Sequence, residues 1–291
     1  MNEYLYTIDS KQPVPIDTEA KIQATVNLEA GNLLYFPDDF FQPTAIEGAL
    51  LCESILNSKH KNISYHHTSK QLAGCAKLES TTLMQAFMHR FADFSKALVD
   101  SILPQYTKEI RWGRTSYRPA EIKGRVSSKR KDDTRVHVDS FAASPVNGLR
   151  ILRVFCNINP YGEPRVWHVG EPFAKVLDAF EPNIPSFSSM RAKLLQLVKA
   201  TKTRRSPYDH YMLHLHDQMK LDDDYQRNLK KQRIDFPAQS TWIVFTDHVS
   251  HAALSGQFLL EQTFYLPVTA MLNPQMSPLR MLEKMKGCVL T

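Results

Sequence analysis

The sequence predicts an α+β fold whose core is a double-stranded β-helix, or jelly-roll, with helical N-terminal support and one helical insertion. At least five apolar, β-rich segments bounded by turn residues lie between residues 134 and 267. A strongly periodic helical segment precedes them, and helical patterns return once within them, at about residues 186–232. Strands that follow one another through short turns favour an antiparallel sheet over strand–helix–strand units.

The part before the core, residues 1–110, is predicted to be mainly helical support. A short apolar run at 32–37 reads as a strand, and threonine-capped helical spacing predicts a helix over 44–57. The clearest helix spans 80–103, where apolar residues recur every three or four positions up to Pro104. Its phenylalanines and methionines are typical of a stripe that covers one face of a sheet.

The jelly-roll core is assigned to residues 111–270, and the whole chain, 1–291, is predicted to form a single domain. The expected strands of the core are 134–139, 149–158, 165–169, 241–245 and 258–267. The insertion is expected to hold helices at 189–198 and 208–232. The basic tail, 271–291, is expected to pack outside the core.

Composition narrows the class of protein. The chain has 291 residues, 43% of them hydrophobic, which is enough for a sizeable core. Four cysteines without a CxxC pair, no secretory pattern at the N-terminus and no apolar run of about 18 residues predict a cytoplasmic protein, soluble or peripheral. A net charge of +6, concentrated at 123–135, 199–205 and 227–233, favours an anionic partner.

A candidate metal site lies at the start of the core. His137 and Asp139 are two apart in a predicted strand, so both side chains point to the same face. A third ligand is expected just after the strand 241–245, where His251 is preferred and His248 is the alternative. Two histidines and one carboxylate form the facial triad of non-heme Fe(II) oxygenases.

Simpler interpretations exist for these and other histidines. A His-x-Asp pattern recurs by chance, and its side chains can make ordinary hydrogen bonds at the end of a strand. The group His60, His66 and His67 lacks an acidic or cysteine companion at ligand spacing, so these are expected to be structural. His210 and His214 share a helix face, but the glutamate of a zinc-protease motif is missing between them.

An iron centre with open positions needs a co-substrate that activates O₂. 2-Oxoglutarate does so by chelation, and its distal carboxylate needs a cation. Residues 252–265 contain no arginine or lysine, so the strand 149–158 is expected to supply it. Arg150 and Arg153 are three apart and face opposite sides; both remain candidates, with Asn157 on the face of Arg153 as a neutral donor.

Longer stretches of the sequence resemble the Kdo (3-deoxy-D-manno-oct-2-ulosonic acid) 3-hydroxylases. The stretches that carry the resemblance are 61–65, 118–119, 131–139, 149–160, 162–167, 208–213 and 240–264. The resemblance implies a dioxygenase that uses Fe(II), 2-oxoglutarate and O₂. It would hydroxylate carbon 3 of a Kdo sugar attached to lipid A, giving D-glycero-D-talo-oct-2-ulosonic acid, succinate and CO₂. His137, Asp139 and the distal histidine of 247–251 would hold the iron.

The partner implied is Kdo-lipid A or a related lipopolysaccharide precursor, whose carboxylates and phosphates suit a basic chain. Contact with the anionic inner membrane face would be peripheral and electrostatic. Residues expected to bind substrate are Arg118, Arg125, Lys129, Arg130 and Arg165. Two alternatives are an oxygenase acting on nucleic acid or protein and a non-catalytic binding protein. No nucleic-acid recognition module is visible in the sequence, so no nucleic-acid partner is expected.

Overall fold

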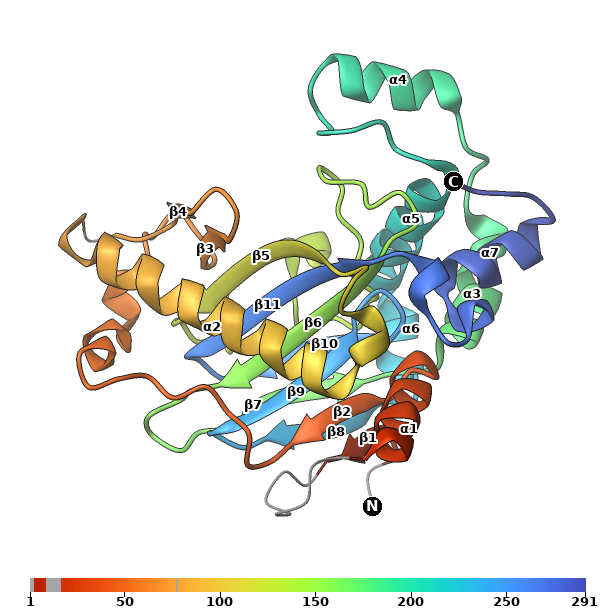
Figure 1. Cartoon of the computed structure of the whole chain (residues 1–291). Helices are drawn as coiled ribbons and strands as arrows, with labels where there is room; N and C mark the ends of the chain where they lie inside the picture. Colours follow the sequence, from red (N-terminus) through yellow and green to blue (C-terminus); the bar gives the residue numbers. More distant parts are fainter. Residues whose placement is uncertain (1–2, 9–16, 77) are drawn as a thin grey trace.

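The computed structural model describes residues 3–8, 17–76 and 78–291. Two sheets and a set of helices make up this mixed helix-and-sheet fold (Figure 1). The large sheet has eight strands in the order β1 (Leu5–Thr7), β2 (Leu33–Phe36), β9 (Ser240–Phe245), β6 (Arg150–Asn157), β11 (Leu259–Leu266), β5 (Arg111–Arg118), β3 (Ile63–His66) and β4 (Gln71–Ala73). The small sheet has the order β10 (His251–Ser255), β7 (Arg165–Val169) and β8 (Gln232–Phe236).

Strand β6 lies at the centre of the large sheet and is buried along its whole length. It pairs antiparallel with β9 and β11, so that Leu152 lies opposite Phe245 on one side and Phe264 on the other. Because both faces of β6 are covered, its apolar residues Ile151, Leu152, Val154, Phe155 and Cys156 point to both faces rather than alternating with polar ones. The two arginines of β6, Arg150 and Arg153, are therefore both buried, on opposite faces of the sheet.

Helices cover the large sheet and extend one end of it. Figure 1 shows α2 (Thr81–Ile102) lying across the sheet, and its buried face includes Phe87 and Phe91. The other helices are α1 (Thr18–Glu29), α3 (Phe173–Phe180), α4 (Ser189–Leu197), α5 (Pro207–Leu221), α6 (Asp223–Asn228) and α7 (Pro278–Lys286). None of the helices in the described ranges is both long and apolar enough to cross a membrane.

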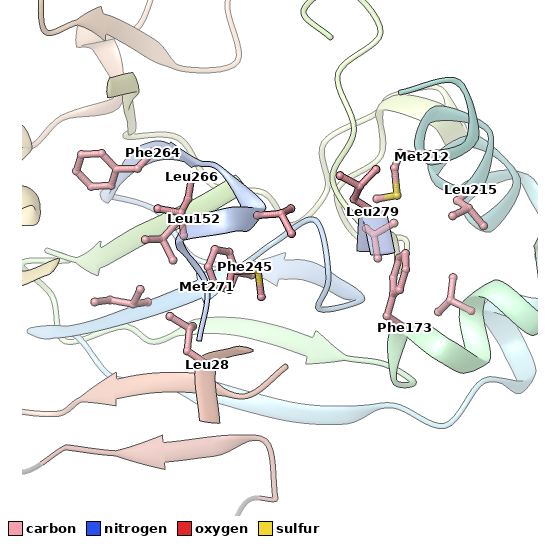
Figure 2. Close-up of a cluster of buried hydrophobic side chains, with 14 of the residues drawn as sticks. Leu28, Leu152, Phe173, Met212, Leu215, Phe245, Phe264, Leu266, Met271 and Leu279 are labelled. Atoms are coloured by element: carbon pink, nitrogen blue, oxygen red, sulfur yellow. The ribbon is translucent and has the colours of Figure 1, made fainter. Parts of the chain in front are cut away.

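One apolar cluster joins the sheet to the helices of the insertion and the tail (Figure 2). The sheet contributes Leu152, Phe245 and Phe264, and α5 contributes Met212 and Leu215. Apolar burial of this kind contributes about 25 cal/mol per Å² removed from water. The insertion is therefore part of the same hydrophobic core as the sheet.

Most predicted elements are confirmed with boundaries shifted by one or two residues. The strands expected at 32–37, 149–158, 165–169, 241–245 and 258–267 correspond to β2, β6, β7, β9 and β11. The helices expected at 80–103 and 189–198 correspond to α2 and α4. The helix expected at 208–232 is divided between α5 and α6, because Asp222 ends one helix and caps the next, and its last four residues are not helical, since Gln232 begins β8.

The helix predicted over 44–57 is wrong. Two 3₁₀ turns, Glu47–Leu50 and Glu53–Ile55, occupy this segment. The hydroxyl of Tyr117 donates to the carbonyl of Leu50 at 3.1 Å, so that carbonyl is engaged from the sheet instead of by the next helical turn.

Three further expectations need correction. Residues 134–139 form no strand, because Val136 N donates to the Gln226 side chain and only His137 makes a β-bridge. Residues 1–110 supply helices, but also the strands β1 to β4 of the large sheet. The tail is not wholly outside, since α7 buries Leu279 and Leu282 in the main cluster.

Candidate active site

The backbone brings three metal-ligating side chains together from two distant segments. His137 and His251 form an isolated antiparallel bridge with N–O distances of 3.0 and 2.8 Å, and Asp139 N donates to Thr246 O at 2.8 Å. The possible ligand atoms of His137, Asp139 and His251 all lie within 4.8 Å of one another, and all three residues are buried. The structure therefore groups the three residues that the sequence singled out.

Hydrogen bonds to the backbone set the tautomer of both histidines. Nδ1 of His137 lies 2.8 Å from Arg135 O, and Nδ1 of His251 lies 2.8 Å from Val249 O. A carbonyl only accepts, so each Nδ1 carries the proton and each Nε2 keeps a lone pair. The ring of Trp167 stacks on His251 with centroids 5.0 Å apart, which further orients the imidazole.

Burial and neighbouring charges determine which groups are ionised. Burial lowers the pKa of His137 to about 4 and also lowers that of His251. Burial alone would raise the pKa of Asp139, but Arg153 and the two histidines outweigh it and hold that pKa well below the usual range. At neutral pH the cluster offers two neutral imidazoles and one carboxylate, a donor set suited to Fe(II).

His248, the alternative third ligand, lies elsewhere. Its ring meets Phe173 edge-on at a centroid distance of 5.5 Å, and its Cε1 lies 3.5 Å from where a side chain on Gly31 would begin. Burial lowers its pKa to about 3. His251, not His248, stands with His137 and Asp139.

The two arginines of β6 have different partners. Arg153 faces the triad, with Nη2 at 3.1 Å from Asp139 Oδ2 and Nη1 at 2.9 Å from Glu261 Oε1. Arg150 points to the other face, where Nε lies 2.7 Å from Asp247 Oδ2 and the guanidinium covers the Phe245 ring at 3.9 Å. Asp247 therefore engages Arg150 within the core, away from the triad, and this position does not support the expectation that Arg150 binds the co-substrate.

Asn157 is also engaged away from the triad. Its Nδ2 donates to the carbonyls of Glu163 and Phe236 at 3.0 and 3.1 Å, and the residue is buried. These bonds join the far end of β6 to β8 and to the turn after β6. Asn157 does not line the cavity at the triad, so its expected role in co-substrate binding is not supported.

Replacing Arg150 with methionine is expected to lower the free energy of unfolding by about 3–5 kcal/mol, because it leaves the buried Asp247 carboxyl group without its cationic partner. Urea unfolding measures this loss. The double variant Arg150→Met, Asp247→Leu removes both charges and should recover most of the stability. A double variant as unstable as the single one would contradict the interpretation.

A cavity of about 240 Å³ adjoins the triad and is strongly cationic. Its acidic wall residues are Asp133, Asp139 and Glu261. Its basic wall residues, excluding histidine, are Lys61, Arg118, Arg130, Lys131, Arg153, Arg165 and Lys220. Seven cations facing three carboxylates make this cavity suited to an anionic ligand.

Arg165 differs from Arg153, the other buried arginine of the cavity, in having no ion pair among the described residues. Its Nη1 donates to Gly256 O at 2.8 Å, its Nε, like that of Arg153, has no hydrogen-bond partner, and no described carboxylate lies within ion-pair distance. Burial and the nearby Arg118 lower its pKa to about 9. Gly256 permits this approach, since its φ is +109° and a Cβ there would lie 3.1 Å from Arg165 Cδ.

A larger groove of about 960 Å³ lies beside the cavity and shares five wall residues with it, Arg118, Ser140, Phe141, Arg153 and Glu261. It is also lined by Arg111, Arg114 and Lys202, which form no ion pair within the described part of the chain. Trp112 and Tyr265 add aromatic surface. The groove can therefore accept further anionic groups of a ligand whose reacting part lies in the cavity.

Comparison with known proteins identifies the family. Residues 12–288 match the family described as 3-deoxy-D-manno-oct-2-ulosonic acid (Kdo) hydroxylase. The chain belongs to the Kdo hydroxylase family. A comparison with curated protein sequences gives no match.

Solved structures of the Kdo hydroxylase KdoO, a non-heme Fe(II) α-ketoglutarate-dependent dioxygenase, are similar to this family member over nearly the whole chain. The cobalt(II) complex is 44% identical with a TM-score of 0.95, covering 99% of this chain and 97% of that one. The complex with α-ketoglutarate and Fe(III) has the same identity and coverage and a TM-score of 0.94. The complex with succinate and Fe(III) is 43% identical, with a TM-score of 0.94 and the same coverage.

Of the five residues expected to bind substrate in this Kdo hydroxylase family member, three line the cavity. Arg118 pairs with Glu261 at 3.2 Å, Arg130 pairs with Asp217 at 3.2 Å, and Arg165 has no acidic partner among described residues. Lys129 is exposed and pairs with Asp223, and Arg125 is not among the wall residues of either cavity. The basic run 123–135 therefore contributes only part of the predicted rim.

The wall residues that the sequence interpretation did not predict include four that carry charge or touch the triad, Lys61, Trp167, Lys220 and Glu261. Lys61 and Lys220 reach the cavity from a loop and from α5, and no spacing in the sequence connects them to the triad. For Trp167 and Glu261, the neighbouring sequence does contain a feature that could have indicated a role at the site. Trp167 is two residues from Arg165 on the same strand face, and Glu261 is the only charged residue of the apolar strand β11.

One of the earlier histidines belongs to a second group of possible ligands. His67, His89 and Asp93 lie within 4.8 Å of one another at the surface. The His67 ring is held between Trp112 and His89, nearly parallel to both, with interplanar angles of 5° and 12°. Stacking and the 3.1 Å contact of its Nε2 with Asp93 account for the position of His67.

Proposed function

We propose that this protein is an Fe(II)- and 2-oxoglutarate-dependent dioxygenase that hydroxylates carbon 3 of a Kdo sugar in Kdo-lipid A. The products would be D-glycero-D-talo-oct-2-ulosonic acid, succinate and CO₂. The observation that carries the proposal is the buried His137, Asp139 and His251 group beside a cationic cavity, in a chain 44% identical to KdoO over 99% of its length. The proposed place of action is the cytoplasmic face of the inner membrane.

The triad fits iron on its own chemistry. Both Nε2 atoms carry free lone pairs, because both Nδ1 protons are donated to backbone carbonyls. Asp139 remains ionised beside Arg153. When bound by these three residues, Fe(II) would leave coordination positions for 2-oxoglutarate and O₂ and supply the oxidising chemistry.

We assign the two sheets to a double-stranded β-helix, the finer form of the mixed fold. The chain passes from β6 in the large sheet to β7 and β8 in the small one, then back to β9, across to β10 and back to β11. Such alternation between two antiparallel sheets is typical of a jelly-roll. It carries His137 and His251 to neighbouring positions, and we propose that all 291 residues form one catalytic unit.

Arg165 is proposed to bind the distal carboxylate of 2-oxoglutarate. This differs from the sequence interpretation, which placed Arg165 with the substrate and favoured Arg150 or Arg153. Asp139 and Glu261 already neutralise Arg153, so its role is to hold the Asp139 carboxylate in position. Arg165 lines the cavity, forms no ion pair with a described carboxylate, and shares a strand face with Trp167, which stacks on His251.

The remaining cations are proposed to bind the anionic substrate. Arg118 and Arg130 would contact the sugar acid that enters the cavity. Arg111, Arg114 and Lys202 of the groove, which pair with no described carboxylate, would contact carboxylate or phosphate groups on the neighbouring part of the substrate. Arginine forks suit both groups because they can bond two oxygens at once.

The test is an aerobic assay with Fe(II) and 2-oxoglutarate. Succinate release should be stimulated by Kdo-bearing lipid A and coupled to the gain of one oxygen atom on Kdo, measured by mass spectrometry. Lipid A without Kdo is the control and should give only the substrate-free rate. Stimulation only by methylated nucleic acid or a peptide would contradict the proposal.

A further inference from the structure

Helix α4 and its flanking segments, residues 186–206, extend away from the rest of the protein (Figure 1). Four large apolar side chains here are strongly exposed. The exposed fractions are 82% for Met190, 57% for Leu194, 79% for Leu197 and 62% for Val198. Single exposed apolar residues are ordinary, but several together mark a surface that is covered by something.

These side chains lie on one face of the helix. At 3.6 residues per turn, positions 190, 194 and 197 follow one another along one side. Ala192 is buried on the opposite side, and Leu195 lines a cavity of about 270 Å³ that reaches α5. The apolar face of α4 is therefore directed to solvent, while its other face is directed to the protein.

The charge of the segment points to an anionic partner. Residues 186–206 contain no aspartate or glutamate and six basic residues, Arg191, Lys193, Lys199, Lys202, Arg204 and Arg205. None of the six forms an ion pair with a described carboxylate. Arg204 and Arg205 donate instead to neutral oxygens, those of the Ser189 side chain and the Ala142 carbonyl.

We propose that the outer face of α4 docks on an anionic lipid membrane. Its apolar side chains would enter the boundary between headgroups and acyl chains, and the flanking lysines and arginines would lie among the headgroups. A second copy of this chain is the less suitable occupant, since a symmetric contact would place two such cationic segments against each other. An anionic bilayer attracts them instead.

The docking face is connected to the site. Lys202 and Thr203, just after α4, line the groove that shares walls with the triad cavity. Docking would therefore bring the groove to the bilayer, where a lipid-anchored sugar would be presented. This last step rests on the proposed function; the docking itself rests on the exposure and charge of residues 186–206.

Vesicle binding tests the inference without any substrate. The full chain should sediment with vesicles of phosphatidylglycerol and phosphatidylcholine, more weakly as salt rises and more weakly with phosphatidylcholine alone. The pair Met190→Gln, Leu194→Gln should weaken binding at least about tenfold, because two apolar side chains no longer leave water. The matched control is Ile22→Gln, Val26→Gln on α1, also four apart and 43% and 47% exposed, which should bind as the original does.

Two further measurements separate the possible outcomes. A Leu197→Trp variant should shift its fluorescence to shorter wavelength on vesicles, as an inserted side chain does. With substrate dispersed in detergent, the Met190→Gln, Leu194→Gln variant should turn over at the original rate. If the unaltered protein showed no turnover in detergent, the proposed function would be contradicted. The vesicle-binding measurements would still test the docking proposal.

Unchanged vesicle binding by the Met190→Gln, Leu194→Gln pair would overturn the inference. A second result would also overturn it. If the unaltered protein were a dimer, and the pair converted it to a monomer without changing vesicle binding, the face would belong to a second copy of the chain. Analytical ultracentrifugation of both proteins measures this directly.

Discussion

Replacing His251 with alanine is expected to abolish Kdo hydroxylation and to weaken Fe(II) or Co(II) binding by more than about 100-fold. Loss of an outer partner of a metal ligand typically costs 10–100-fold in affinity, and loss of the ligand itself should exceed that. The His251 Nε2 lone pair points to the group formed with His137 and Asp139, and nothing else described stands in its place. Calorimetry with Co(II) measures the affinity independently of turnover.

His248→Gln is the matched control for this prediction. The side chain lies against Phe173 and next to Gly31, away from the triad, so its replacement should cost stability but leave metal affinity unchanged. If His248→Gln removed metal binding while His251→Ala kept it, the assignment of the third ligand would be wrong.

Arg165→Met is expected to weaken 2-oxoglutarate binding by about 2–5 kcal/mol, roughly 30-fold or more, the usual cost of truncating one partner of a buried charge pair. The free energy of unfolding should stay the same or rise, because a buried guanidinium without an acidic partner is lost. Arg150→Met, by contrast, is expected to lower the free energy of unfolding. Calorimetry of the Co(II)-loaded protein and urea unfolding measure the two quantities.

The comparison variant is Arg165→Lys, which keeps a charge but loses the planar fork and should bind 2-oxoglutarate with intermediate affinity. A different result would reassign the residue. If Arg165→Met left 2-oxoglutarate affinity unchanged and raised the KM for the Kdo substrate, Arg165 would belong to the substrate site. A larger loss of 2-oxoglutarate affinity in Arg153→Met would make Arg153 the anchor.

Local sequence patterns predicted those features that depend on neighbouring residues. Helix α2 and strands β6, β7, β9 and β11 have periodicities and turn residues that leave little choice of structure. The helix prediction for 44–57 failed because of a contact from outside the segment. The hydroxyl of Tyr117 on β5 donates a hydrogen bond to the Leu50 carbonyl. No pattern within 44–57 contains that information.

The candidate site likewise has features that the local sequence predicts and features that depend on the fold. The sequence by itself determined His137 and Asp139 as neighbours, the late segment expected to supply a third ligand, and the basic character of the chain. It left His248 and His251 open, and only the backbone bridge between His137 and His251 places His251 beside the other two residues. Likewise, alternation along β6 predicted that Arg150 and Arg153 face opposite ways, but not which faces the triad.

Tertiary structure alone decided the charge balance of the cavity. Arg153 is neutralised by Asp139 from one segment and Glu261 from β11, while Arg165 forms no ion pair with a described carboxylate. Such differences arise from distances between residues on separate segments, 14 positions apart for Arg153 and Asp139 and 108 for Arg153 and Glu261, and electrostatic interactions depend on those distances and on burial. The sequence therefore determined which chemical groups this protein carries, and folding determined which of them remain available to a ligand.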